Sequence, residues 1–271
     1  TRRRANLAAL GLVATSAGVL AHMGRKKAKK GDSWDDSWFE AGSTCKPSAL
    51  PPQRLSLGVG RPVVPPGVEL EQAAHIETEV HVLLEDSFSS AMISATPVLT
   101  PEECAAWITW GETTGFVLEK HAQTGYIAHR DNGRLSVDSD EIAAALFERL
   151  RPWVPTEVAG LRATRCNPNI RLYRYTEGQR FGKHVDQANQ LKDGSTTEFT
   201  VLVYLNDEGL VGGETLFYDG HGARAPEAVR FAPRAGAALV HAHGDRCLTH
   251  EASAVTSGVK YVLRSDLAFV R

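Results

Sequence analysis

Residues 169–206 contain two strand-like runs, NIRLYRY (169–175) and FTVLVYLN (199–206). Both runs are rich in β-branched, aromatic and other apolar residues with the two-residue periodicity of strands. Similar runs follow, separated by turns rich in Gly and Asp, and they span 214–218, 237–243, 247–251 and 259–270. Because no helical pattern separates these runs, the segment predicts an antiparallel sandwich or barrel.

Toward the N-terminus the periodicity becomes helical. Thr100-Pro-Glu-Glu103 predicts a helix start, because Thr can cap, Pro suits the first turn and Glu follows the cap by three residues. Asp138-Ser-Asp-Glu141 gives a similar signal before an apolar stripe that Pro152 ends. Residues 75–84 alternate and predict a strand. We therefore expect an α+β protein in which supporting helices precede a β core.

Composition narrows the class of protein. The chain has 271 residues and a net charge of −2, which is ordinary for a globular protein of one or two domains. Residues 1–30 hold eight basic and no acidic side chains, which leaves 22 basic against 32 acidic residues in 31–271. An acidic body argues against nucleic acid as a partner, because phosphate contacts need a basic surface. The four cysteines form no C-x-x-C pair, which argues against a cysteine-based zinc site.

The sequence predicts four segments. Residues 1–30 are expected to be a targeting or membrane-anchor segment, because the apolar run 5–21 is flanked by basic clusters. A cleaved organellar or secretory-pathway signal, a retained membrane attachment and an ordinary core helix stay open for this segment. Residues 31–67 read as a Pro-rich linker, since six of the 13 prolines lie between Pro47 and Pro66. A helical N-terminal part (68–165) and a core (166–271) are expected to form one compact domain.

The segment FGKHVD (181–186) places His184 and Asp186 two residues apart. On an extended strand these side chains point to the same face. His250, in another expected strand, offers a second imidazole. Two His and one carboxylate on one face of a metal leave three positions open, which is the arrangement of non-haem Fe(II) oxygenases. H-x-D pairs also arise by chance, so the surrounding residues decide the interpretation.

Lys260 follows His250 by ten residues on an expected strand. A lysine that points into a barrel needs an anion, because an unpaired buried ammonium is costly, whereas an outward lysine is simply solvated. A dicarboxylate co-substrate would supply that anion. Tyr175 shares a face with Tyr173 in the strand before the H-x-D pair, and Thr200 and Tyr204 share a face of the strand after it.

Together these segments resemble the prolyl 4-hydroxylase-like 2-oxoglutarate/Fe(II)-dependent dioxygenases. The resemblance covers roughly residues 95–271. The segments that carry it are TPEECAAWITWGETTGF (100–116), RLYRYTEGQRFGKHVD (171–186), VYLN (203–206), GGETLF (212–217) and HEASAVTSGVKYVLRSD (250–266). The resemblance implies a double-stranded β-helix, or jelly-roll, core with helices packed outside it. It also implies Fe(II) bound by the metal ligands His184, Asp186 and His250.

The resemblance further implies that Lys260 pairs with the far carboxylate of 2-oxoglutarate, with hydrogen bonds to this co-substrate from Tyr204, Thr200 and Tyr175. L-Ascorbate (vitamin C) is the expected reductant. The implied reaction hydroxylates an unactivated C–H bond with O2, releasing succinate and CO2. Peptidyl proline is the leading substrate, while another protein side chain or a small molecule stays open.

Two positions depart from the collagen-type family pattern. Tyr261 stands where such enzymes usually carry Trp, and Phe181 where Tyr is frequent. Both are expected near a bound substrate. A second class of function also stays open, because His241 and His243, with Glu251 nearby, are similar to a cupin pattern. In that class the protein would be a metal- or ligand-binding jelly roll without oxygenase activity.

Overall fold

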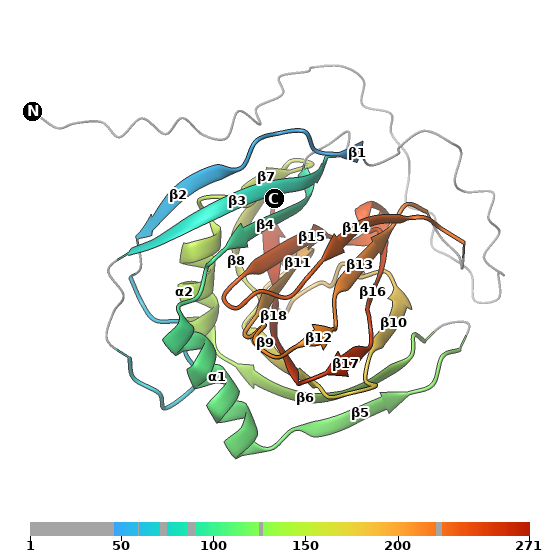
Figure 1. The fold of residues 1–271 in the computed structure, drawn as a ribbon. Helices are drawn as coiled ribbons and strands as arrows, with labels where there is room; N and C mark the ends of the chain where they lie inside the picture. Colours follow the sequence, from blue (N-terminus) through green and yellow to red (C-terminus); the bar gives the residue numbers. More distant parts are fainter. Residues whose placement is uncertain (1–45, 59, 71–74, 86–89, 125–126, 221–223) are drawn as a thin grey trace, which may run out of the picture. The chain divides into compact units, whose positions relative to one another are not determined.

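The computed structural model describes residues 46–271 except 59, 71–74, 86–89, 125–126 and 221–223 (Figure 1). The compact unit spans Cys45–Arg271. The expected targeting or anchor segment lies outside the described residues, as does the first part of the expected linker. Within the described chain, no helix has the length and apolar character needed to cross a membrane.

The N-terminal elements alternate strands with two helices. They are β1 (Lys46–Pro47), β2 (Gln53–Gly58), β3 (His75–Glu85), β4 (Ser90–Thr96), α1 (Pro101–Thr114), β5 (Val117–His121), β6 (Arg130–Asp138), α2 (Asp140–Leu150), β7 (Glu157–Val158) and β8 (Leu161–Cys166). The C-terminal elements are almost all strands. They are β9 (Asn169–Tyr175), β10 (Phe181–His184), β11 (Thr196–Tyr204), β12 (Val211–Gly212), β13 (Thr215–Tyr218), β14 (Glu227–Phe231), β15 (Ala238–Ala242), β16 (Thr249–Ala252), β17 (Val255–Ser257) and β18 (Lys260–Val270).

The strands form the expected jelly-roll core from two facing layers. One layer follows the order β3-β4-β15-β11-β18-β9-β6, and the other follows β10-β16-β13-β14. The pairings among the described strands are antiparallel, and β10 joins β6 of the other layer where Phe181 pairs with Arg130. Figure 1 shows the smaller layer curling over the larger one.

Successive side chains along each strand point to opposite faces and pack into two separate hydrophobic clusters. On β11, Val201 and Val203 pack outward against the cluster that contains helix residues such as Trp107 and Leu146. Tyr204 on the same strand packs inward, between the two layers. Because the outer face is covered by α1 and α2 and the inner face by the second layer, both faces of β11 are buried. This two-sided burial explains why the run reads as nearly continuous apolar sequence.

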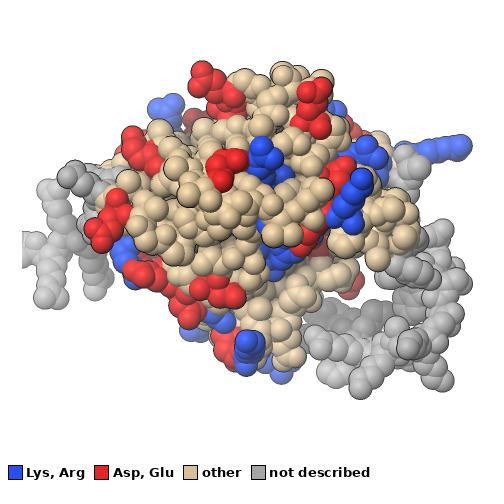
Figure 2. Space-filling view, turned by 90° about the horizontal axis from the view of Figure 1, so that it is seen from below, with Lys and Arg blue, Asp and Glu red and all other residues tan. Residues whose placement is uncertain are grey.

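The helices begin where the sequence predicts. Thr100 caps α1 with a complete capping box that includes Glu103, and Ser139 caps α2. The apolar stripe of α2, from Ile142 to Leu150, is buried against the outer face of the large layer. Figure 2 shows that acidic and basic side chains are interspersed over one face of the molecule.

The structure departs from the predicted linker and from the predicted helical half. Residues 53–58 alternate as QRLSLG and pair along β3, so that Leu57 is buried. This run contains no proline, which is why it can join a sheet although prolines surround it. The segment 68–165 also contributes more strands than helices, and β4, β6 and β8 extend the large layer.

A buried ion pair fastens the chain before β3 to the helices. The two terminal nitrogens of Arg149, Nη1 and Nη2, each donate a hydrogen bond of 2.5 Å to one oxygen of the Glu103 carboxylate. Glu103 also accepts a hydrogen bond from the Val63 amide, whose carbonyl accepts one from the Trp107 indole. The side chains of the pair are 1% and 3% exposed, so the two charges depend on each other.

We expect Arg149→Leu to lower the free energy of unfolding by about 3–5 kcal/mol, because it leaves the Glu103 carboxylate buried without a counter-charge. The matched control is Glu148→Gln, which breaks the exposed pair between Arg61 and Glu148 and should cost no more than about 1 kcal/mol. Urea unfolding of the full chain measures both values. Equal losses in the two variants would contradict this account of the buried pair.

Candidate functional site

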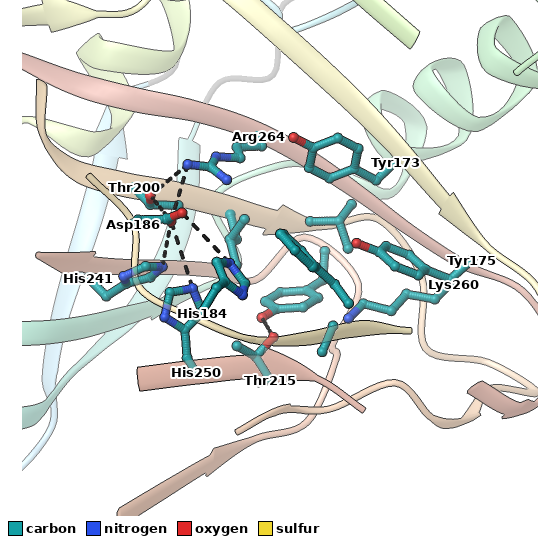
Figure 3. Close-up of a pocket in the computed structure, with 15 residues that line it drawn as sticks. Tyr173, Tyr175, His184, Asp186, Thr200, Thr215, His241, His250, Lys260 and Arg264 are labelled. Carbon is teal, nitrogen blue, oxygen red and sulfur yellow. Dashed lines mark hydrogen bonds and ion pairs between the residues drawn. The ribbon is translucent and has the colours of Figure 1, made fainter. Parts of the chain in front are cut away.

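A pocket opens between the two layers, and all seven predicted site residues line it (Figure 3). They are His184, Asp186, His250, Lys260, Tyr204, Tyr175 and Thr200. The predicted metal ligands gather at one end of the pocket, and Lys260 lies toward the other. The pocket is also lined by Phe181, which was expected near a substrate, by His241 of the cupin-like pattern, and by Tyr173, Thr215 and Arg264.

The metal-ligand end depends on the pairing of β10 with β16. His184 stands directly opposite His250 in this antiparallel pair, so both imidazoles point into the same space. Asp186 follows two residues later on the same face, with an oxygen 3.7 Å from Nε2 of His184 and the other 3.8 Å from Nε2 of His250. Ligand atoms of the three residues all lie within 4.8 Å of one another.

Hydrogen bonds and burial determine the protonation state of both imidazoles. Nδ1 of His184 bonds the Gly182 carbonyl at 2.8 Å, and Nδ1 of His250 bonds the Leu248 carbonyl at 2.9 Å. Because a carbonyl can only accept, each Nδ1 carries the proton and each Nε2 keeps its lone pair. Burial lowers the pKa of His184 to about 3 and also lowers that of His250, so both rings are neutral at pH 7.

Asp186 is held as a carboxylate. Burial alone would raise its pKa, but Arg264 and the surrounding histidines hold this pKa well below the usual value. One oxygen, Oδ2, accepts a hydrogen bond from the Thr200 hydroxyl at 2.6 Å and lies 3.1 Å from the Arg264 guanidinium. Two neutral imidazoles and an ionised carboxylate that converge in this way fit Fe(II).

Lys260 forms the cationic end of the pocket. It is 2% exposed, and its ammonium donates to the Gly213 carbonyl at 2.5 Å. Among the described residues it forms no ion pair with an acidic side chain, and burial lowers its pKa to about 7. The register of β18 places Tyr175 directly opposite it, and the rings of Tyr175 and Tyr204 lie 5.3 and 5.4 Å from the ammonium.

The loop before β18 fixes this register. Gly258 has a φ of 81°, and a Cβ at this position would lie 2.5 Å from the carbonyl oxygen of Gly209. Only glycine fits such a turn without strain. The next inward side chain of the strand is therefore that of Lys260, while Tyr261 points outward.

The two departures from the family pattern have different outcomes. Phe181 lines the pocket, and its ring stacks on His184 with centroids 3.8 Å apart. Tyr261 does not line the pocket, which corrects its expected position near a substrate. Its hydroxyl donates to Glu112 of α1 at 2.6 Å on the outer face of the layer. The reason is parity, because neighbouring residues of a strand face opposite sides.

Arg264 and Thr215, which are not among the seven predicted site residues, contact Asp186 and Tyr204 respectively. Arg264 follows Lys260 by four positions on β18, so the same parity that pointed Lys260 inward could have identified it. It bridges Asp186 and Asp266, with its guanidinium 3.3 Å from the latter. Thr215 follows the GGE turn, and its hydroxyl lies 2.7 Å from that of Tyr204. The sequence of the GGE turn did not predict this hydrogen bond between Thr215 and Tyr204.

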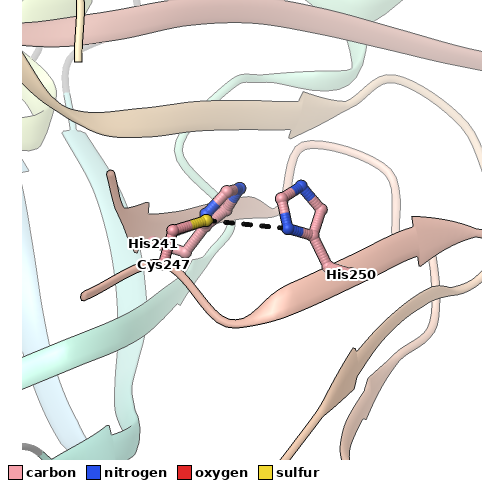
Figure 4. A group of neighbouring side chains, drawn as sticks. All are labelled: His241, Cys247 and His250. Carbon is pink, nitrogen blue, oxygen red and sulfur yellow. Dashed lines mark hydrogen bonds between the residues drawn. The ribbon is translucent and has the colours of Figure 1, made fainter. Parts of the chain in front are cut away.

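The two histidines of the cupin-like pattern have separate environments. Nε2 of His241 lies 3.8 Å from Asp186, is buried and has no hydrogen-bond partner. With Cys247 and His250 it forms a second group of possible metal ligands (Figure 4). Nε2 of His243 instead lies 2.7 Å from the Thr200 hydroxyl. Burial raises the pKa of the Cys247 thiol to about 12, which leaves it a thiol at pH 7.

Comparisons with known proteins place this site in a family. A protein-family model described as the 2OG-Fe(II) oxygenase superfamily matches residues 170–265, about a third of the chain. No curated protein sequence matches the chain. The matched residues include all three predicted metal ligands and Lys260.

Similar solved structures share little sequence with this chain. The viral collagen prolyl hydroxylase of Paramecium Bursaria Chlorella virus-1, in a 2OG complex, has 17% identity and a TM-score of 0.45, covering 66% of this chain and 97% of that one. A Pseudomonas putida prolyl-4-hydroxylase has 16% identity and a TM-score of 0.41, covering 65% and 91%. A Trichoplax adhaerens prolyl hydroxylase, in complex with a hypoxia inducible factor peptide fragment, has 17% identity and a TM-score of 0.43, covering 59% and 73%.

The match over residues 170–265 supports the resemblance to 2-oxoglutarate/Fe(II)-dependent oxygenases that the sequence motifs carry. The protein is accordingly a 2-oxoglutarate-dependent dioxygenase, an oxidoreductase.

Proposed function

We propose that the protein hydroxylates an unactivated C–H bond, and that its substrate is a prolyl residue of a protein or peptide. The reaction converts R–H, 2-oxoglutarate and O2 into R–OH, succinate and CO2, so that one oxygen atom enters the alcohol and the other enters succinate. The observation that supports the proposal best is the combination of the His184, Asp186 and His250 group with a buried, unpaired Lys260 in one pocket.

In this proposal His184, Asp186 and His250 hold Fe(II), which supplies the redox chemistry that activates O2. The two imidazoles offer lone pairs that their Nδ1 hydrogen bonds orient. The Asp186 carboxylate lowers the net charge of the centre. Phe181 covers one side of His184 and provides an apolar wall, which suits the approach of a C–H group.

Lys260 is proposed to bind the far carboxylate of 2-oxoglutarate, because its ammonium is buried and forms no ion pair with an acidic side chain of the described residues, although the charge of Glu214 raises its pKa. Tyr175, opposite Lys260, and Tyr204 are proposed to complete the pocket around this carboxylate. Thr200 is less suited to a co-substrate contact, because its one hydroxyl proton is donated to Asp186. The role of L-ascorbate as a reductant rests on the sequence resemblance.

The proposal is tested first without oxygen, by adding Fe(II) and then 2-oxoglutarate to the full chain and recording the visible spectrum. We expect a charge-transfer band that is absent in His184→Ala and needs at least about tenfold more 2-oxoglutarate in Lys260→Ala, because one hydrogen-bonded ion pair is lost. Iron-loaded, folded protein without a band would refute the oxygenase site.

The substrate is tested next with proline-rich peptides, by mass spectrometry of the peptide and by succinate release. We expect a mass increase of one oxygen atom that is matched by succinate and is lost when alanine replaces the prolines. Succinate release that no proline-containing peptide stimulates would instead favour a non-prolyl or small-molecule substrate.

Binding of 2-oxoglutarate should take up a proton above pH 7. The pKa of Lys260 is about 7 in the free protein, because burial disfavours the ammonium, and an anion beside it raises this pKa again. At pH 8 about 0.9 protons should therefore enter per molecule bound, and affinity should fall by up to about tenfold per pH unit above 7.

Calorimetry with Mn²⁺-loaded protein, in buffers of different ionisation enthalpy, measures this proton uptake. Lys260→Arg is the matched control, because an arginine stays charged across this range. If the wild-type protein and the arginine variant took up equal numbers of protons, Lys260 would not be the group that titrates.

The unpartnered Nε2 of His241 favours a second candidate function, the cupin-like binding module. In that function His241→Phe abolishes metal binding, because His241 belongs to the group with Cys247 and His250. The oxygenase proposal instead expects a change within about threefold in His241→Phe, and more than about 100-fold weaker Co²⁺ binding in His250→Phe. Phe is chosen because both rings already pack against Phe217.

A further inference from the structure

The two oxygens of Asp186 have different surroundings. Oδ2 accepts a hydrogen bond from Thr200 and an ion-paired contact from Arg264. Oδ1 has no hydrogen bond from any described residue, and it lies 3.7 Å from Nε2 of His184. The donors on Asp186 therefore gather on one oxygen and leave the other for the metal.

The direction of the hydrogen bonds around Thr200 follows from its single proton. An ionised carboxylate can only accept, so the Thr200 hydroxyl donates to Asp186. Nε2 of His243 lies 2.7 Å from the same hydroxyl. The other ring nitrogen, Nδ1, lies 3.2 Å from the Thr197 carbonyl and 3.3 Å from the Thr197 hydroxyl, which itself accepts from the Asn189 amide. Thr200 therefore donates to Oδ2 while the His243 ring, fixed by Thr197, packs against its hydroxyl.

Arg264 also has hydrogen-bond partners other than Asp186, and these fix its position. Its guanidinium bonds Asp266 at 3.3 Å and the Thr200 hydroxyl at 3.2 Å. Asp266 is 1% exposed, and it accepts from the Asn167 amide and lies 3.7 Å from Arg171. A guanidinium with this many fixed partners keeps its contact with Asp186.

We propose that Thr200, held by His243, and Arg264 are positioning residues that keep Oδ2 away from the metal, so that Asp186 binds through one oxygen only. The inference rests on the proposed function. A six-coordinate metal with three protein ligand atoms has three open positions, two for a chelating keto acid and one for O2. A carboxylate that bound through both oxygens would occupy the third position. The donors on Oδ2 therefore preserve the position that O2 needs.

Thr200→Val tests this role, with Thr200→Ser as the matched control that keeps the hydroxyl. We expect Thr200→Val to bind Fe(II) and 2-oxoglutarate within about threefold of wild type, as measured by the anaerobic charge-transfer band. After mixing with O2, that band should decay at least about tenfold more slowly than in wild type, the size expected from one hydrogen bond to a charged group. Thr200→Ser should restore the decay.

A readout without turnover examines the carboxylate itself. The infrared difference between Co²⁺-loaded and metal-free protein, labelled with ¹³C-aspartate, reports the separation of the two carboxylate stretches. We expect this separation to narrow in Thr200→Val, as binding through both oxygens becomes populated, and to stay unchanged in Thr200→Ser. His243→Phe, which removes the imidazole that contacts the Thr200 hydroxyl, should narrow it as well and serves if Thr200→Val does not fold.

The outcomes separate the two proposals. Absence of the band in wild type would refute the proposed function and not this inference alone. A normal band and normal O2 decay in Thr200→Val, with an unchanged carboxylate spectrum, would overturn the inference while leaving the function intact. Loss of all metal binding in Thr200→Val but not in Thr200→Ser would also overturn it, since Thr200 would then hold the ligand itself in place.

Discussion

A carboxylate that stays ionised between two sheets needs donors around it, and this constraint organises the interior of the protein. Asp186 meets it with Arg264, Thr200 and the neighbouring imidazoles. Arg264 in turn needs a second acid, which Asp266 supplies. The inner face of the large layer is therefore polar around the predicted metal ligands, although the outer face of the same strands is apolar. Isolated buried charges would be far more costly than this connected set.

The same strands thus perform two tasks. Their outward side chains pack against α1 and α2 and stabilise the fold, while their inward side chains build the pocket. Two-sided burial holds each strand in a fixed register, because a slip by one residue would exchange the two sets. Catalytic geometry and stability consequently depend on the same pairings, above all those of β18 with β9 and β11.

Residue spacing was enough to predict the periodic elements. NIRLYRY became β9 with its predicted bounds, both helices began at their predicted caps, and the predicted metal ligands converge in one pocket. Sequence reasoning failed where three-dimensional packing decides. The short strand β2 was hidden among prolines, and Tyr261 was placed near the substrate although parity turns it outward. Strand parity places Arg264 on the face of Lys260, but its partner Asp186 lies on another segment, which no single strand reveals.

The opposite orientations of Lys260 and Tyr261 have a consequence for how this chain can change in length. One residue gained or lost between Gly258 and Lys260 would bring a phenol or an aliphatic group to the end of the pocket and turn the ammonium toward α1. Insertions at exposed turns elsewhere leave the paired strands untouched. A one-residue insertion or deletion between Gly258 and Lys260 would therefore remove the ammonium from the pocket as completely as a substitution of Lys260 itself.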